Sequence, residues 1–273
     1  MSAEIVERVS EWFASAARPL PWRSSEATAW HVLISEFMLQ QTPVVRVLPM
    51  YERWVEMFPI PSALAAVPVS ESVRQWGRLG YPRRAQRLHA VSVIIDRDYD
   101  DQVPSDIEQL RALPGVGEYT AAAVMAFAFQ RRSVVVDTNI RRVLARAVEG
   151  QQWPSLSLTR NEMNRAESLV PVSDVAASQW SAAVMELGAV VCTASNPRCD
   201  LCPIAELCAW QKRGAPMSPR PHRTQAWHGT DRQYRGLIVQ RLREVEDPVP
   251  TAQLRSRSEE HTSELQSRET ISY

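Results

Sequence analysis

Four cysteines in one short stretch constrain the fold of this 273-residue chain more than any other feature. They are its only cysteines, and their spacing is Cys192-x₆-Cys199-x₂-Cys202-x₅-Cys208. The sequence begins without the basic and apolar segments of an export signal, so we expect thiolates that bind a soft metal rather than disulfides. Zinc ribbons usually carry two Cys-x₂-Cys pairs and this stretch carries one, which favours one [4Fe-4S] cluster over structural zinc.

The composition is that of a globular protein. Hydrophobic residues make up 45% of the chain, the formal net charge is zero, and no apolar run is long enough to cross a membrane. We therefore expect a cytoplasmic protein with no membrane partner. The only lysine is Lys212, so a mechanism that needs a lysine Schiff base would have to use Lys212 or the N-terminal amine.

A helical hairpin is predicted around one tight turn, Leu113-Pro114-Gly115-Val116-Gly117. Pro114 is excluded from helix interiors and glycine adopts backbone angles closed to other residues, so an alanine-rich second helix can begin almost at once. The N–H groups of Gly115, Val116, Gly117 and the new helix's first turn lack internal partners and lie at the positive end of the helix dipole. Such a site suits a phosphate. An ordinary helical hairpin with a glycine-rich corner is the alternative.

Two carboxylates stand in positions suited to acid–base chemistry. Glu36 lies in the middle of a predicted helix over residues 29–41 that is apolar nearly all round, and burial there raises a carboxyl pKa toward the value that a general acid needs near neutral pH. Asp137 follows a run of three valines and can cap the helix that runs to Val148. The alternatives are structural: Glu36 could pair with an arginine or cap backbone groups, and Asp137 could serve only as the helix cap.

The rest of the chain predicts an all-α fold. Prolines divide it into short helices, and strand-like alternation is scarce. Residues 213–230 are basic and proline-rich and are interpreted as a linker, and residues 231–256 as the start of a small C-terminal domain that is helical or winged-helix-like. Residues 257–273 resemble the translation of a sequencing adapter and are set aside as a non-native tail, with a natural disordered tail as the alternative.

The hairpin turn, the aspartate about 20 residues after it and the cysteine spacing together resemble the helix-hairpin-helix DNA glycosylases of the endonuclease III superfamily. Within it, residues 35–42 and 185–189 resemble the MutY-type adenine DNA glycosylases, and the likeness spans residues 5–212. The resemblance implies two helical domains that flank a DNA-binding cleft. One is a six-helix, barrel-like domain with the hairpin (residues 29–132), and the other is an iron–sulfur domain (residues 1–28 plus 133–212).

The resemblance also implies a reaction. The substrate would be double-stranded DNA in which adenine pairs with 8-oxoguanine or guanine, and the adenine would be extruded before it is cleaved. Glu36 would protonate the departing purine at N7, and Asp137 would stabilise or capture the cationic sugar, with Tyr119 and Asn139 orienting the pair. Hydrolysis would leave an abasic site.

Further residues carry family roles only through this match. The predicted contacts with adenine or DNA come from Trp22, Arg23, Leu39, Gln41, Thr42, Tyr81, Gly115, Val116, Gly117 and Glu186. Trp22 as a core residue, Glu186 as a helix surface residue and Gln41 with Thr42 as a helix C-terminal turn are the alternatives. The family commonly has two tyrosines where this chain has Tyr81-Pro82. We therefore expect Tyr81 or a neighbouring arginine to be the duplex wedge, or the DNA to be kinked in another way.

Departures from the family leave other functions open. Endonuclease III-like members place a reactive lysine where this chain has Tyr119, so we predict a monofunctional enzyme. We also expect it to act as a monomer. Thr138 stands where the adenine subfamily often has glycine. A mismatch-specific thymine glycosylase, an oxidised-pyrimidine glycosylase of the endonuclease III type and a non-catalytic iron–sulfur DNA-binding module are the alternatives, and Glu36 argues against the first.

Overall fold

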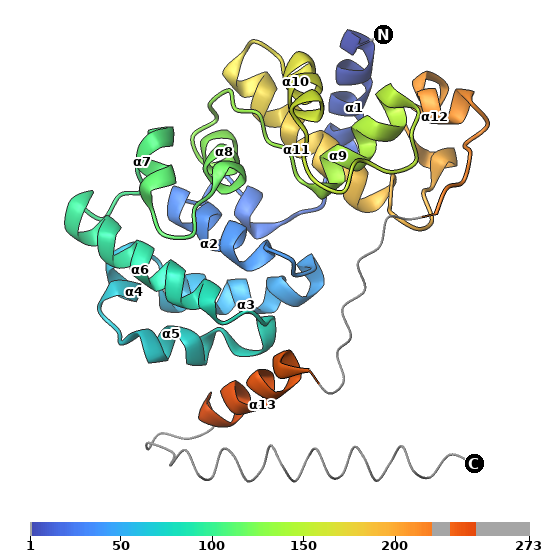
Figure 1. Cartoon of the computed structure of the whole chain (residues 1–273). Helices are drawn as coiled ribbons and strands as arrows, with labels where there is room; N and C mark the ends of the chain where they lie inside the picture. The colour runs from blue at the N-terminus through green and yellow to red at the C-terminus, as the bar shows by residue number, and fades with distance from the viewer. Residues whose placement is uncertain (1, 220–229, 244–273) are drawn as a thin grey trace, which may run out of the picture.

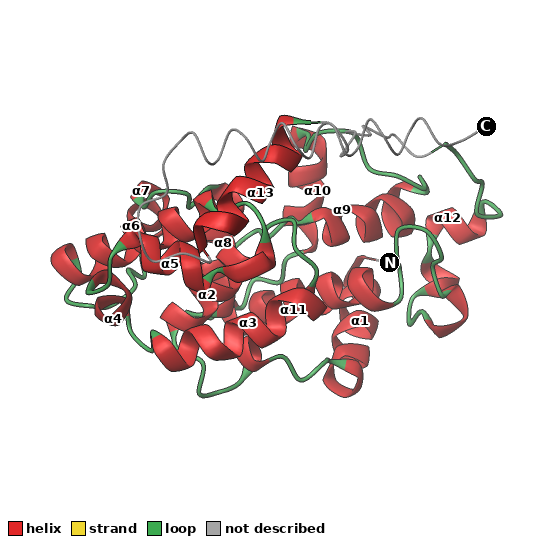
Figure 2. Cartoon of the chain, turned by 90° about the horizontal axis from the view of Figure 1, so that it is seen from below, coloured by secondary structure: helices red, strands yellow, loops and turns green. Residues whose placement is uncertain are grey.

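The computed structural model describes residues 2–219 and 230–243, and all regular structure within them is helical, as predicted (Figure 1, Figure 2). The helices are α1 (Ser2–Ala16), α2 (Ala29–Leu39), α3 (Val44–Met57), α4 (Pro61–Ala65), α5 (Val69–Gln75), α6 (Arg83–Asp98), α7 (Ile107–Ala112), α8 (Glu118–Phe127), α9 (Thr138–Leu144), α10 (Arg160–Leu169), α11 (Asp174–Val190), α12 (Ala209–Lys212) and α13 (Asp231–Arg243).

The described residues form two hydrophobic cores. One is built mainly by α2 to α8 and the other by α1 and α9 to α12. Figures 1 and 2 show α4 to α7 at one end of the molecule and α1, α9 and α12 at the other. Helix α8 contributes to both cores, with Ala121 and Val124 in the first and Ala122, Ala123 and Ala126 in the second. The junction of the two cores therefore runs along α8.

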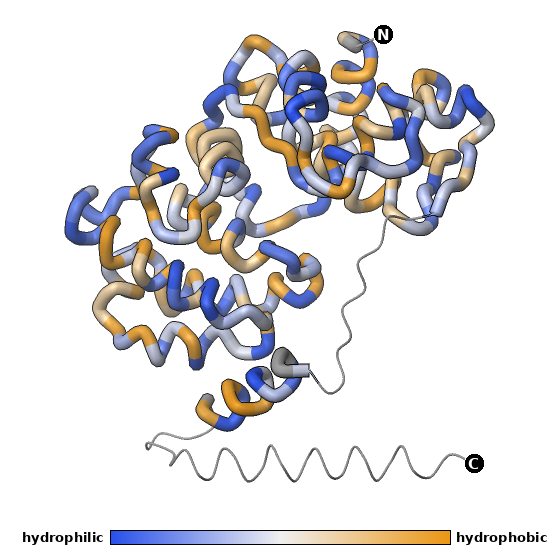
Figure 3. The backbone as a smooth tube through the Cα atoms, viewed as in Figure 1, coloured by the Kyte–Doolittle hydropathy of each residue, from blue (hydrophilic) through white to orange (hydrophobic). Residues whose placement is uncertain are grey.

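Helix α2 passes through the first core. It is hydrophobic along most of its length (Figure 3), and Leu33, Ile34, Phe37 and Met38 are fully buried. Each such side chain contributes about 1.5–3 kcal/mol to folding. The helix begins at a capping box in which Thr28 accepts from the backbone N–H of His31, so local sequence fixes where α2 starts.

The predicted hairpin is present. Helices α7 and α8 flank the turn, and Gly115 has a φ of 86°, a value that other residues rarely adopt. A Cβ on Gly115 would lie 2.7 Å from Cδ of Arg87, so the position is closed to larger residues for a second reason. The turn thus depends on Gly115 for both its backbone angle and its packing against α6.

Several predicted segments fall partly outside the described residues. These are residues 220–229 of the linker, 244–256 of the C-terminal domain and the whole of 257–273. Helix α13 begins where the predicted C-terminal domain begins. Within the part of the chain that the structure describes, no helix is long and apolar enough to span a membrane.

Candidate active site

Glu36 and Tyr119 meet where α2 packs against α8. Glu36 is 6% exposed, and the Tyr119 hydroxyl donates a hydrogen bond to it. Burial raises the pKa of Glu36 to about 7, the Tyr119 bond acts against this rise, and the nearby charge of Asp137 adds to it. The structure thus gives this buried carboxyl the raised pKa that the sequence predicted, which is the property a general acid needs near neutral pH. Its partner is a tyrosine and not the arginine of the structural alternative.

Asp137 is both a helix cap and a member of this group. Its Oδ1 accepts from the backbone N–H of Ile140 at 2.7 Å, which caps α9, and its Oδ2 accepts from Asn139 Nδ2 at 2.7 Å. Burial raises the pKa of Asp137, and the bonds from Ile140 and Asn139 act against this rise. Asp137 thus does cap α9, and the cap is compatible with a role in the site because it fixes the carboxylate in place.

Tyr119 lies close enough to both carboxyl groups to feel their charges. Burial, followed by the charges of Glu36 and Asp137, raises the pKa of Tyr119 well above its ordinary value, so the phenol stays a hydrogen-bond donor. The structure therefore brings together Glu36 on α2, Tyr119 on α8 and Asp137 at the start of α9. A hydrogen bond from Asn139 holds Asp137.

Asn139 is fixed from two sides. Its Oδ1 accepts from Arg142 Nη2 at 2.7 Å, which determines that Nδ2 faces Asp137. Behind it, a Cβ on Gly188 would lie 2.7 Å from Asn139 Cβ and 2.8 Å from the Asn139 carbonyl oxygen. Helix α11 therefore packs against the start of α9 at a distance that only glycine permits.

Glu186 lies on α11 two residues before Gly188 and is fully buried, so the surface alternative is wrong. Its carboxylate accepts from Arg18 Nε at 2.5 Å, from Arg18 Nη2 at 2.9 Å and from Arg23 Nη2 at 3.0 Å. Burial acts to raise the pKa of Glu186, but the bonds and charges of the two arginines lower it below its ordinary value. Glu186 is thus a buried, ionised acceptor. Sequence reasoning missed Arg18, whose only signal is that a buried carboxylate on α11 needs a partner.

Arg23 and Trp22 belong to the 3₁₀ turn η1 (Pro21–Arg23). The Nη1 atom of Arg23 is buried and has no hydrogen-bond partner within the described residues, so it is a spare donor beside Glu186. Trp22 is half-buried and packs edge-on against Tyr51, with ring centroids 5.0 Å apart and an interplanar angle of 76°. Trp22 is therefore packed against the first hydrophobic core, as in the core alternative, and keeps part of its surface exposed.

The residues predicted to touch DNA occupy three turns. Leu39 ends α2 half-buried, Gln41 is exposed, and Thr42 is buried with its hydroxyl donating to the Leu79 carbonyl oxygen at 3.4 Å. Tyr81 is 43% exposed in the turn before α6.

At the hairpin, the Val116 N–H already donates to the Leu113 carbonyl oxygen at 3.1 Å, so it is not free for a phosphate as the sequence suggested. No side chain caps the start of α8 at Gly117, whose N–H with those of the helix's first turn suits an anion.

All four cysteines line one pocket. Arg146 is 1% exposed, donates to Cys192 Sγ at 3.4 Å, and stacks on the ring of Trp210 at 5.0 Å. Within the described residues no three His, Cys, Asp or Glu side chains are close enough to hold a single metal ion. Four thiol side chains that line one pocket, with a buried guanidinium against them, fit an anionic iron–sulfur cluster.

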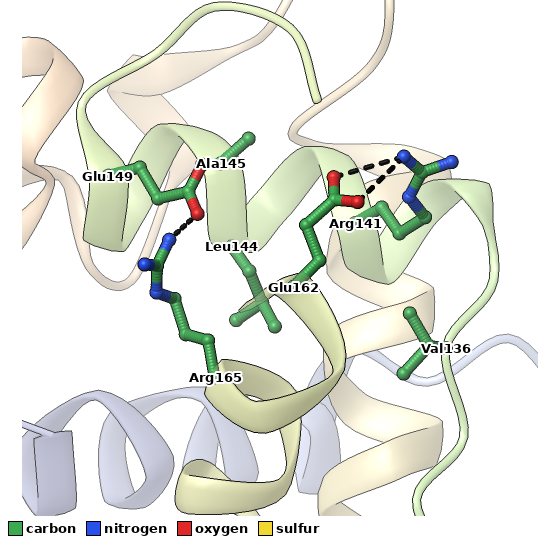
Figure 4. Close-up of a pocket in the computed structure, with 7 residues that line it drawn as sticks. All are labelled: Val136, Arg141, Leu144, Ala145, Glu149, Glu162 and Arg165. Carbon is green, nitrogen blue, oxygen red and sulfur yellow. Dashed lines mark hydrogen bonds and ion pairs between the residues drawn. The ribbon is translucent and has the colours of Figure 1, made fainter. Parts of the chain in front are cut away.

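A second enclosed space lies outside this group. It is closed by two arginine–carboxylate pairs, Arg141 with Glu162 at 3.0 Å and Arg165 with Glu149, which tie α10 to α9 and to the π-helical turn η3 (Ala145–Glu149) (Figure 4). The side chains point toward each other across the gap, and none of them was predicted as a site residue. The pairs hold the iron–sulfur end of the molecule together.

Comparison with known proteins agrees with the geometry. Residues 34–167 match the HhH-GPD superfamily of base excision DNA repair proteins, and residues 192–208 match the iron–sulfur binding domain of endonuclease III. The second match confirms the predicted cluster over zinc.

The sequence is 50% identical to the adenine DNA glycosylase of Mycolicibacterium smegmatis over 93% of this chain and 85% of that protein. It is 49% identical to the adenine DNA glycosylase of Mycobacterium tuberculosis over 89% of this chain and 80% of that protein. It is 36% identical to the adenine DNA glycosylase of Mus musculus over 74% of this chain and 41% of that protein. Among solved structures, a thermostable thymine-DNA glycosylase is similar with a TM-score of 0.70 and 27% identity, over 78% of this chain and 97% of that one. A non-covalent endonuclease III–DNA complex has a TM-score of 0.66, with 78% and 98% covered.

Proposed function

The chain belongs to the adenine DNA glycosylases of the HhH-GPD superfamily, and we propose that it hydrolyses the N-glycosidic bond of adenine paired with 8-oxoguanine or guanine in double-stranded DNA. The observation that carries the proposal is Glu36, a buried carboxyl with a pKa of about 7, beside the carboxylate of Asp137. A proton donor and a negative charge in one enclosed place are what cleavage of a purine from its sugar requires.

The reaction divides between the two carboxyl groups. With the adenine extruded from the stack, the Glu36 carboxyl gives its proton to N7 of the departing base, since adenine anion is a poor leaving group. The N-glycosidic bond then breaks, and its electron pair leaves with the protonated base. The positive charge left on the sugar faces Asp137. Asn139 and the Ile140 N–H hold the Asp137 carboxylate in place, so the charge develops next to a group that need not move. Water then completes the abasic site.

The donor and acceptor pattern of Arg23 and Glu186 suits recognition of adenine. Glu186 is kept ionised by Arg18 and can accept from an exocyclic amine, and the spare Nη1 of Arg23 can donate to a ring nitrogen. Trp22 supplies an aromatic wall. A thymine offers no N7 for Glu36, which argues against the thymine glycosylase alternative despite the similarity in fold.

The remaining residues hold DNA and the fold. The start of α8 suits a phosphate of the backbone, and Gln41 with Tyr81 presents two exposed side chains to the duplex. Cys192, Cys199, Cys202 and Cys208 hold the [4Fe-4S] cluster, which fixes the loops after α11. We propose that the enzyme acts as a monomer on nucleoid DNA in the cytoplasm.

A substrate panel tests the proposal. Purified protein in excess is incubated with duplexes that contain A:8-oxoG, A:G, T:G or thymine glycol, and each sample is analysed with and without alkali. We expect adenine release from the first two and strand breakage only after alkali, because Tyr119 stands where a lyase needs lysine. Activity confined to pyrimidines, or breakage without alkali, would overturn the proposal, and binding without any excision would indicate the non-catalytic alternative.

A further inference from the structure

Two exposed residues in separate loops share an uncommon backbone conformation. Gln41, after α2, has a φ of 56°, and Tyr81, before α6, has a φ of 48°. Residues other than glycine rarely adopt this left-handed region, and they persist in it only where the surroundings hold them. Gln41 is among the residues expected to contact DNA and Tyr81 is an expected duplex wedge, so what holds these two loops matters for the reaction.

One buried arginine binds the end of α2 and the loop that follows it. The Nη1 atom of Arg84 donates to the carbonyl oxygens of Phe37 at 3.0 Å, Met38 at 2.7 Å and Gln40 at 2.7 Å. These are carbonyls that the end of a helix leaves without partners, at the negative end of its dipole. The guanidinium thus fixes the residue on the N-terminal side of Gln41.

The same guanidinium binds the second loop. Its Nη2 donates to the hydroxyl of Thr42 at 2.9 Å and to the carbonyl oxygens of Leu79 at 3.1 Å and Gly80 at 3.0 Å. Thr42 follows Gln41, and Gly80 precedes Tyr81. The residues on both sides of Gln41 and the residue before Tyr81 are therefore bonded to one planar group.

Aromatic contacts complete the arrangement. The Arg84 guanidinium lies 5.2 Å from the ring centroid of Trp76 and 5.6 Å from that of Tyr81. The backbone N–H of Arg84 also donates to the Tyr81 carbonyl oxygen at 2.9 Å. Arg84 is 5% exposed, and burial lowers its pKa to about 10, so it remains charged at neutral pH. A group this buried meets no DNA itself and acts through the loops.

We propose that Arg84 is a positioning residue that couples Gln41 to Tyr81, so that both side chains enter the duplex together around the extruded nucleotide. The inference rests on the proposed function, because it assumes that these loops meet DNA. Lysine cannot replace Arg84 in this role. Its single nitrogen cannot direct two separate donor groups at two loops, whereas the guanidinium fork does so with little further ordering.

The first test is the variant Arg84→Lys, with Arg83→Lys as the matched control. Arg83 is the adjacent arginine on α6 and is exposed, so the control makes the same exchange without touching the loops. The probe is a duplex with 2-aminopurine opposite tetrahydrofuran, an abasic analogue that cannot be cleaved. We expect Arg84→Lys to slow the fluorescence change on binding about tenfold, with affinity for undamaged duplex within about twofold of the parent. A rate equal to that of Arg83→Lys, in protein with normal helix and iron content, would overturn the proposal.

A double-mutant cycle separates coupling from a general structural effect. Affinity for the tetrahydrofuran duplex is measured for Gln41→Ala, Tyr81→Ala and the double variant, in the parent and in Arg84→Lys. We expect the two substitutions to be non-additive by about tenfold in the parent and additive within about twofold in Arg84→Lys. Additive effects in the parent would sink the idea.

A milder variant covers the case in which Arg84→Lys does not fold. Thr42→Val keeps the shape of the side chain and removes the hydroxyl that links the two loops, and Thr42 is itself buried. We expect it to reduce the same non-additivity by at least about threefold, and an unchanged cycle would contradict the proposal. Because the probe contains no cleavable adenine, the result does not depend on excision, and failure of the proposed function shows separately in the substrate panel.

Discussion

Replacing Glu36 by glutamine should abolish general acid catalysis and, above neutral pH, stabilise the fold. The pKa of Glu36 rises from an ordinary value of 4.5 to about 7 when the chain folds, because burial disfavours its charge. Glutamine keeps an oxygen that can accept from Tyr119 and never ionises. The substitution therefore removes the cost of a buried charge and keeps the contact.

The sign and size of the stability effect follow from proton linkage. Between pH 4.5 and 7 the folded parent binds a proton that the unfolded chain has lost, so the free energy of unfolding of the parent falls as pH rises and levels off above 7. Each tenfold change in proton affinity is worth about 1.4 kcal/mol, so the parent loses about 3 kcal/mol across this window. In a chain of this size that corresponds to roughly 5 °C in melting temperature.

The assay is the difference in melting temperature between Glu36→Gln and the parent, measured at matched scan rate from pH 4.5 to 8.5. We expect a difference near zero at the acid end that grows to about 5 °C in favour of the variant above pH 7. In parallel, the parent's single-turnover rate on the A:8-oxoG duplex should fall about tenfold for each pH step of one above 7, and the variant should be slower by about 10²–10⁴-fold at pH 7.

Two results would refute this reasoning. A variant that is no more stable than the parent at pH 8.5 would mean that folding does not raise the pKa of Glu36. A variant that excises adenine at the parent's rate would mean that the proton comes from another group.

Three further outcomes are expected. Asp137→Asn should keep the helix cap and leave the melting temperature within about 2 °C of the parent, yet slow single-turnover excision by about 10²–10³-fold; a rate within tenfold would count against Asp137. Gly188→Ala places a Cβ 2.7 Å from Asn139 Cβ, so calorimetry should show a fall of about 2–6 °C and excision should slow with it, whereas unchanged values would contradict the packing argument. The parent should be brown, with absorption near the blue-violet edge that Cys202→Ser weakens together with the iron content; a colourless parent with stoichiometric zinc would contradict the cluster assignment.

Local sequence was sufficient to predict a feature wherever the residues that form it lie close together in the chain. The cysteine spacing indicated an iron–sulfur cluster because the four ligands lie within residues 192–208. Gly115 indicated the hairpin because a tight turn needs its backbone angle. Glu36 stood out as a buried acid because its helix has no polar face on which a carboxylate could meet water.

Other features depend on contacts between distant segments, which periodicity does not encode. Arg18 and Glu186 are 168 residues apart, so no local pattern joins them, and the surface alternative for Glu186 was open until α11 was seen buried. Arg84 stands next to Arg83 and near Arg87 in the sequence, and only the packing of α6 against the end of α2 shows it to be 5% exposed.

The sequence by itself thus determined the helical class, the iron–sulfur domain and the Asp137 helix cap, and it predicted Glu36 as the acid. Only the tertiary structure decided that Glu36, Tyr119 and Asp137 form one group, since they lie on α2, α8 and at the start of α9. The physical reason is that the helix a residue belongs to follows largely from its neighbours in sequence, whereas the pKa of Glu36 depends on which helices exclude water around it and which charges they bring near.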